Sequence, residues 1–236
     1  MEELQTPVLE PKVAALTSEA RITFYRKTYT HLTLSVLLFI LVEMIFFQIE
    51  PLINFALSLT QGWTWLLLLG GFMFATNYAE KMALETQDKN RQYLALLLFV
   101  VAEAFIFIPL LYIAISYIGD GGLHTISQAG IMTGALFVGL SAVTIMTKKD
   151  FSFLRSGLTI AGFIAIGLIV AGTLFGFNLG LWFSVGMIAL ASGSILYQTS
   201  NMVHKYQEDQ YVAASLGLFG ALMLLFWYIL SIFSRD

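Results

Sequence analysis

The sequence predicts an all-α integral membrane protein, built as a bundle of seven transmembrane helices. Three observations support this fold class: a very apolar composition, seven apolar segments of bilayer length, and basic residues confined to alternate loops. Of the 236 residues, 58% are hydrophobic and 11% are charged, whereas a soluble domain carries about 25% charged residues. So few charges cannot cover the chain with a polar surface in water, which excludes a soluble enzyme and a disordered chain.

The seven apolar segments define the elements of the bundle. A hydrocarbon core of about 30 Å needs about 20 residues of helix, and apolar runs without alternation do not fit the strands of a barrel. The predicted spans are residues 32–49, 63–79, 93–118, 126–146, 157–177, 179–197 and 211–233. The boundary between the fifth and sixth spans is the least defined, because only Asn178 separates them, although Gly176 and Gly180 favour a turn there.

The positions of lysine and arginine predict the orientation, because these residues concentrate in cytoplasmic loops. All 12 except Arg235 lie in the N-terminal tail or in the loops after the second, fourth and sixth spans. We therefore expect a cytoplasmic N-terminus and an external C-terminus. The alternation also supports the count of seven spans, since a missed helix would place basic loops on both sides of the membrane.

Two regions follow from this pattern: a polar cytoplasmic tail, residues 1–30, and a seven-helix transmembrane domain, residues 31–236. The tail contains Pro7 and Pro11 and has no apolar stripe before Glu19, which is typical of a solvated terminus. Its alternative role is a handle for a cytoplasmic partner. With a formal net charge of −3, the chain lacks the basic surface typical of nucleic-acid binding.

Two carboxylates lie inside predicted spans: Glu103 near the middle of the third and Glu43 in the outer half of the first. Lipid offers no hydrogen-bond partners, so an ionisable group at this depth is costly and marks a candidate functional site. Neither carboxylate has a lysine or arginine within reach on its own helix. We expect each to face the bundle interior, as a cation or proton site or, alternatively, as a neutral acid hydrogen-bonded across a helix interface.

A polar face marks the cytoplasmic end of the sixth span, where Gln198, Asn201 and His204 recur every three residues. This pattern fits either a cluster that gates the cytoplasmic mouth or a helix end that meets lipid headgroups and water.

Enzymatic chemistry finds little support in the residues. The last span has no lysine for a retinal Schiff base, and the spans contain no aspartate for an intramembrane aspartyl protease. The remaining alternative is a hydrolase in which Ser141, within a Gly-Leu-Ser-Ala run, is the nucleophile and His204 is its base. Such a tetrapeptide is, however, common by chance in apolar helices. We expect no catalytic residues, no metal site and no cofactor.

Three stretches of the C-terminal half resemble the Bax inhibitor-1 family. The loop between the family's fourth and fifth spans is similar to the run at 147–154, Thr-Lys-Lys-Asp-Phe-Ser-Phe-Leu. The end of its sixth span is similar to the run at 193–204, Gly-Ser-Ile-Leu-Tyr-Gln-Thr-Ser-Asn-Met-Val-His. Its last helix is similar to residues 211–230. The ending Phe-Ser-Arg-Asp at 233–236 is similar to that of the bacterial YccA-like subgroup. The resemblance extends from about Arg21 to the C-terminus.

The resemblance implies six helices packed around a central seventh. For the YccA-like subgroup it implies modulation of the ATP-dependent membrane protease FtsH, acting with HflK and HflC, which is engaged through the cytoplasmic tail. Other members of the family are described as pH-sensitive calcium leak channels that use a hydrogen-bonded pair of aspartates.

This chain departs from the channel pattern, because Gln198 and Gly220 align with the paired aspartates and neither residue titrates. That pH sensor is therefore missing. We expect a non-enzymatic, multi-pass protein of the bacterial inner membrane that associates with FtsH and modulates it. The alternative is a leak for calcium or protons through Glu103, without the aspartate pair.

Overall fold

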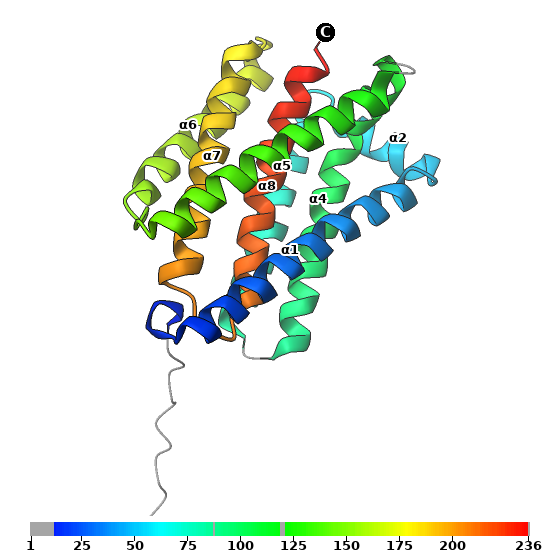
Figure 1. Ribbon diagram of the computed structural model, residues 1–236. Coiled ribbons are helices and arrows are strands. Elements are labelled where there is room, and N and C mark those ends of the chain that lie inside the picture. The colour runs from blue at the N-terminus through cyan, green and yellow to red at the C-terminus, as the bar shows by residue number, and fades with distance from the viewer. Residues whose placement is uncertain (1–11, 87, 119–120, 236) are drawn as a thin grey trace, which may run out of the picture.

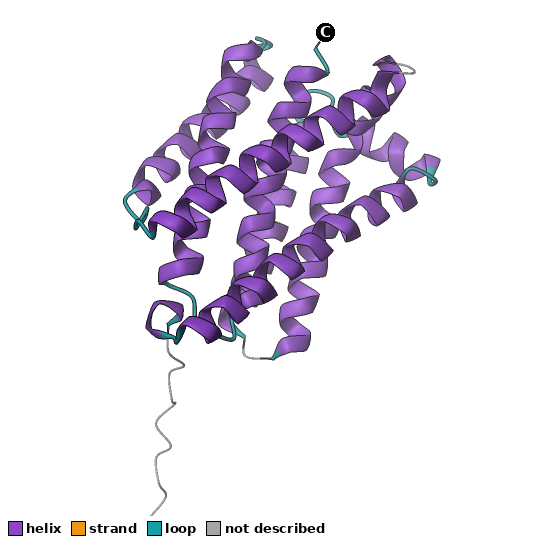
Figure 2. Cartoon of the chain, in the orientation of Figure 1, coloured by secondary structure: helices purple, strands orange, loops and turns teal. Residues whose placement is uncertain are grey.

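The computed structural model describes residues 12–86, 88–118 and 121–235 of the chain. These residues form a bundle of α-helices joined by short connections, and no β-strand occurs among them (Figures 1 and 2). Within them the elements are a short 3₁₀ helix, η1 (Val13–Ala15), and the helices α1 (Ser18–Phe46), α2 (Glu50–Ser58), α3 (Thr64–Glu85), α4 (Lys89–Ile118), α5 (Gly122–Thr147), α6 (Leu154–Phe175), α7 (Gly180–His204) and α8 (Tyr211–Phe233).

Six helices in the described part of the chain are long and apolar enough to cross a membrane: α1, α4, α5, α6, α7 and α8. They correspond to six of the seven predicted spans, so the prediction of an all-α membrane protein is confirmed. The second predicted span lies in α3, which has 22 residues but carries Asn77, Glu80 and Lys81 in its C-terminal half. These polar groups lower its hydropathy, and the seventh crossing through α3 stays a prediction.

Helix α1 begins earlier than its apolar run. It starts at Ser18 rather than at residue 32, and so within the range 1–30 that the sequence assigned to the tail. The Thr17 hydroxyl caps it by accepting a hydrogen bond from the backbone N–H of Ala20 at 3.3 Å. Hydropathy marks only the part of a helix that contacts hydrocarbon, which is why it missed the polar turns before this part.

The connections between helices follow their proline and glycine residues. The loop expected at residues 50–62 contains α2, with Pro51 in its first turn, where the missing N–H of proline costs no helical bond. Helix α6 ends at Phe175 rather than 177, followed by Gly176 at φ 73°, and α7 begins at Gly180, at φ 71°, rather than at 179. Both angles are left-handed and favour glycine, so the predicted turn between these glycines is confirmed.

Helix α8 lies in the centre of the bundle (Figure 1). It packs against α1, α3, α4, α5 and α7, while α6 packs mainly against α7 and α3. Its bounds are those predicted, 211–233, and Leu216, Phe219 and Leu225 are completely buried. The first described residues and the C-terminal end of α8 lie at opposite ends of the bundle (Figure 1).

Candidate intramembrane site

The two intramembrane carboxylates predicted from the sequence are both buried, but they lie in different cavities. Glu43 of α1 is 6% exposed and Glu103 of α4 is 5% exposed. Glu43 lines a groove of about 590 Å³ between α1, α4, α5 and α8. Glu103 lines a cavity of about 100 Å³ bordered by α3, α4, α6 and α8. The two carboxylates therefore do not form a pair.

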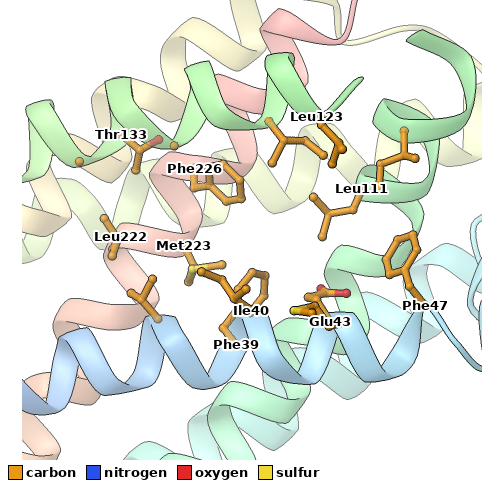
Figure 3. A pocket seen from close by; sticks show the side chains of 16 residues that line it. Phe39, Ile40, Glu43, Phe47, Leu111, Leu123, Thr133, Leu222, Met223 and Phe226 are labelled. Carbon is orange, nitrogen blue, oxygen red and sulfur yellow. The ribbon is translucent and has the colours of Figure 1, made fainter. Parts of the chain in front are cut away.

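The groove around Glu43 is apolar almost throughout. Figure 3 shows the Glu43 side chain pointing from α1 into the space below α5, near Leu111 and Phe47. Neither carboxyl oxygen has a hydrogen-bond partner among the described residues. Thr133 of α5 also lines the groove, but its hydroxyl donates to the backbone carbonyl of Ala129 at 2.7 Å. Glu43 is thus an isolated acid in a largely hydrocarbon-like space.

Glu103 lies in a smaller cavity with an aromatic border that includes Trp65, Trp227 and Tyr228. The part of the chain that the structure describes holds no group of three or more His, Cys, Asp or Glu residues arranged to bind a metal. Because Ca²⁺ takes about six to eight oxygen ligands, one carboxylate in an apolar cavity does not make a chelating site for this ion.

An apolar wall separates the two cavities. Met223 of α8 borders both of them. Phe39, on the Glu43 side, meets Phe107, on the Glu103 side, edge to face with ring centroids 5.2 Å apart. Phe107 also meets the ring of Trp227 at 4.9 Å. Any polar connection between the two carboxylates would require these side chains to move.

Gln198 and Gly220, the positions that the sequence resemblance predicts to align with the family's paired aspartates, have separate neighbours. A Cβ placed on Gly217 of α8 would lie 3.1 Å from Cδ of Gln198, so the amide of Gln198 packs against Gly217. A Cβ on Gly220 would instead lie 2.9 Å from Cζ of Phe99 on α4. Close helix packing thus occupies both positions.

The predicted polar face at the end of α7 is only partly exposed. Asn201 is buried at 8% exposure, and its Oδ1 has no hydrogen-bond partner among the described residues. The Nδ1 atom of His204 lies 3.0 Å from the backbone carbonyl of Ser200. Ser141 Oγ lies 3.5 Å from Thr199 Oγ1, so the described structure shows no hydrogen bond between Ser141 and His204 of the kind that the hydrolase alternative needs.

The residue that organises this end of the bundle, Ser200, was missed from the sequence. Its hydroxyl accepts a hydrogen bond from the backbone N–H of Phe151 at 2.9 Å and lies 3.4 Å from Asp150 Oδ1. Asp150 in turn accepts from the N–H of Ser152 at 2.8 Å. Hydrogen bonds from Ser152, above all, hold the pKa of Asp150 below its ordinary value. The Asp-Phe-Ser spacing of an Asx turn was the available signal.

The segment before α1 is docked on the connection between α7 and α8. Lys12 forms an antiparallel bridge with Gln207, and the N–H of Val13 donates to the carbonyl of Tyr206 at 2.9 Å. The Val13 side chain is completely buried. The Arg21 guanidinium also donates to the carbonyls of Ala14 and Leu16, each at 3.2 Å. No apolar pattern in the sequence marks this contact, because one buried valine supplies it.

These features define the class: a multi-pass α-helical membrane protein with a central helix and two buried carboxylates in separate cavities. Comparison with known proteins gives the family. A family model described as "Inhibitor of apoptosis-promoting Bax1" matches residues 21–236. The chain therefore belongs to the Bax inhibitor-1 family, as the sequence motifs predicted.

Several characterised and uncharacterised proteins are similar to it. The chain is 35% identical over 126 residues to "Modulator of FtsH protease YccA" of Escherichia coli K12, covering 51% of this chain and 57% of that protein. It is 36% identical over 119 residues to an uncharacterized protein of Pseudomonas aeruginosa, covering 50% and 53%. It is 28% identical over 227 residues to "Protein lifeguard 4" of Mus musculus, covering 92% and 87%.

The similarity to the bacterial proteins spans about half of their length. A "Golgi anti-apoptotic protein" of vaccinia virus, 30% identical over 115 residues, is matched over 47% of either chain. The names modulator, anti-apoptotic protein and lifeguard describe regulatory proteins and point away from an enzyme.

Proposed function

We propose that this protein is a non-enzymatic, multi-pass protein of the bacterial inner membrane that associates with the FtsH protease, with HflK and HflC, and modulates it. The observation that carries this proposal is the 35% identity over 126 residues to a protein named as a modulator of FtsH protease. Glu43 and Glu103 lie in separate cavities, and Ser141 and His204 form no hydrogen bond with each other among the described residues, so hydrolytic chemistry gains no competing support.

The proposed topology has seven crossings, including α3, with the N-terminus in the cytoplasm and the C-terminus outside. It is supported by the positions of the two described chain ends at opposite ends of the bundle, as an odd number of crossings requires (Figure 1). The 12 basic residues, all but Arg235 on one side of this arrangement, agree with it.

Cysteine labelling tests this topology cleanly, because the chain contains 0 cysteines. A membrane-impermeant thiol reagent is expected to label Asp236→Cys from outside intact spheroplasts, and Glu2→Cys only after the membrane is opened. Labelling of both positions from the same side would overturn the proposed topology.

The tail supplies the proposed contact with the protease. Lys12 and Val13 are held against the α7–α8 connection, so the described chain begins at this face. The polar residues before Lys12 would form the handle that FtsH engages, while the helices stay packed. The segment 1–11 lies outside the described residues, and its role rests on its polar composition.

Two experiments test the association and the handle separately. Tagged protein, extracted in a mild detergent, is expected to co-purify with FtsH and HflK/HflC. Recovery of the tagged protein without FtsH would contradict the association. Deletion of residues 2–11 should lengthen the half-life of this protein in cells that contain FtsH. Replacement of the same residues by a Gly-Ser sequence of equal length is the matched control, and a deletion with unchanged half-life would exclude the handle.

The second candidate function is a cation leak through the bundle. It is favoured by one observation, the burial of Glu43 and Glu103 in cavities on either side of Met223. Reconstituted vesicles that contain a calcium dye would then show a flux that falls in Glu103→Gln. A protein that gives no flux at any pH would remove this candidate without affecting the proposed association with FtsH.

A further inference from the structure

The groove that contains Glu43 has the properties of a ligand site. Its volume of about 590 Å³ falls in the range of about 300–1,000 Å³ that small-molecule sites occupy. Such sites are mostly apolar and hold a few polar groups that fix the orientation of the ligand. Here the walls are side chains of α1, α4, α5 and α8, and the one acidic side chain among the lining residues is Glu43 (Figure 3).

The groove opens towards the surrounding hydrocarbon. At its rim, Ile40, Met44 and Leu123 are 48%, 61% and 69% exposed. At its floor, Phe39 and Met223 are buried. Exposed apolar side chains on a membrane-spanning bundle face lipid tails, so a molecule with a hydrocarbon chain reaches the groove from within the bilayer.

Glu43 decides which kind of molecule fits. Its side chain is more than nine-tenths buried, and both carboxyl oxygens lack a hydrogen-bond partner among the described residues. The lining residues include no lysine, arginine or histidine. A buried acid without a partner is costly, and nearly all buried polar groups in proteins are paired. A plain acyl chain in the groove would leave both oxygens unpaired, whereas an ammonium group donates up to three hydrogen bonds and carries the complementary charge.

We infer that the groove between α1 and α5 binds a lipophilic amine, with the hydrocarbon chain along the apolar walls and the ammonium group on the Glu43 carboxylate. Glu43 is then a specificity residue, since the walls accept any hydrocarbon chain and the carboxylate selects the amine. This site is independent of the proposed contact with FtsH, which lies at the far end of α1, where η1 docks.

The test uses two photoreactive probes of equal chain length, a diazirine-bearing dodecylamine and the matching dodecanol, on the full chain in phosphatidylcholine nanodiscs. The amine is expected to label peptides of α1 and α5 that line the groove, at a lower half-saturating concentration than the alcohol. Glu43→Gln should raise that concentration for the amine on the order of tenfold or more, the effect of losing a hydrogen bond to a charged group. It should change the value for the alcohol much less, because the single O–H of the alcohol can donate to either side chain.

Two further variants serve as controls. Glu103→Gln removes the other buried carboxylate, which lies in the separate cavity, and should leave labelling by the amine unchanged. A Cβ on Gly134, which lines the groove, meets nothing within 4 Å. A larger side chain there takes up space in the groove, so Gly134→Leu should reduce labelling by both probes.

Equal labelling of the native protein by amine and alcohol would overturn the inference and would assign the groove to lipid tails in general. Labelling of the amine outside the groove, or an unchanged concentration in Glu43→Gln, would overturn it as well. If Glu43→Gln does not fold, the comparison of the two probes on the native protein and on Gly134→Leu still decides the matter.

Discussion

Docking of the N-terminal segment predicts how fast trypsin cleaves the bond between Lys12 and Val13. Val13 is completely buried, and its N–H donates to the carbonyl of Tyr206 at 2.9 Å. Lys12 itself is exposed, but a protease needs a free, extended backbone on both sides of the bond. Cleavage therefore requires the segment to undock, and its rate follows the undocked population when docking is fast relative to cleavage.

The size of the effect follows from the burial of one side chain. Val13→Ala removes two methyl groups from buried contact, each about 0.8 kcal/mol, so docking weakens by about 1.5 kcal/mol. Since about 1.4 kcal/mol corresponds to a factor of ten, the undocked population and the cleavage rate should rise about tenfold. Ala15→Ser changes an exposed neighbour and should leave the rate near that of the native protein.

The assay is brief trypsin treatment of the purified protein in nanodiscs, with the N-terminal fragment quantified by mass spectrometry. Cleavage in the loop at Lys148 and Lys149, which are exposed, serves as the internal reference, because global unfolding would accelerate both sites. A Val13→Ala rate equal to the native rate would refute the reasoning that burial of this side chain holds the segment in place.

Helix packing and one loop carboxylate give two further predictions. A Cβ on Gly220 would lie 2.9 Å from Phe99 Cζ, whereas one on Gly130 meets nothing within 4 Å. The Gly220→Ala protein should therefore be less stable than the Gly130→Ala protein by about 1–3 kcal/mol. Equal thermal stability of the two variants in the same detergent would contradict the contact. Hydrogen bonds from Ser152 lower the pKa of Asp150 from 3.8. The ionised carboxylate of Asp150 therefore stabilises the folded loop above about pH 4, and this stabilisation is lost as the pH falls through the lowered pKa. The amide protection factor of Ser152 should therefore fall on acidification in the native protein but not in Asp150→Asn, and a pH-independent native value would contradict this.

The fold could be predicted to the level of its apolar segments. Helix α8 has the predicted bounds, 211–233, because polar residues stop its apolar run sharply at both ends. The turn between α6 and α7 was predicted from Gly176 and Gly180, which both take a left-handed conformation. The polar start of α1 and the C-terminal end of α3 were not predicted, since helices continue through turns that hydropathy assigns to water. Helix α2 was not predicted because its 9 residues are too few to cross a membrane.

The candidate site could be predicted only as single residues. Burial of Glu43 and Glu103 was expected from the cost of a carboxylate in lipid and is found. Their separation into two cavities by Met223, Phe39 and Phe107 was not expected. The role of Ser200 in fixing the loop at Asp150 was likewise missed, because its partners lie about fifty positions away in the chain.

By itself, the sequence determined the class of this protein, the family, and the approximate limits of its helices, because each follows from composition and from residues close together in the chain. Tertiary structure alone decided which way each carboxylate points, which helices border each cavity, and where the N-terminal segment docks. The physical reason is that a helix in lipid is apolar on the faces that meet lipid and on those that meet protein. Its sequence therefore has no amphipathic stripe to fix its rotation, and only the packing of the other helices sets it.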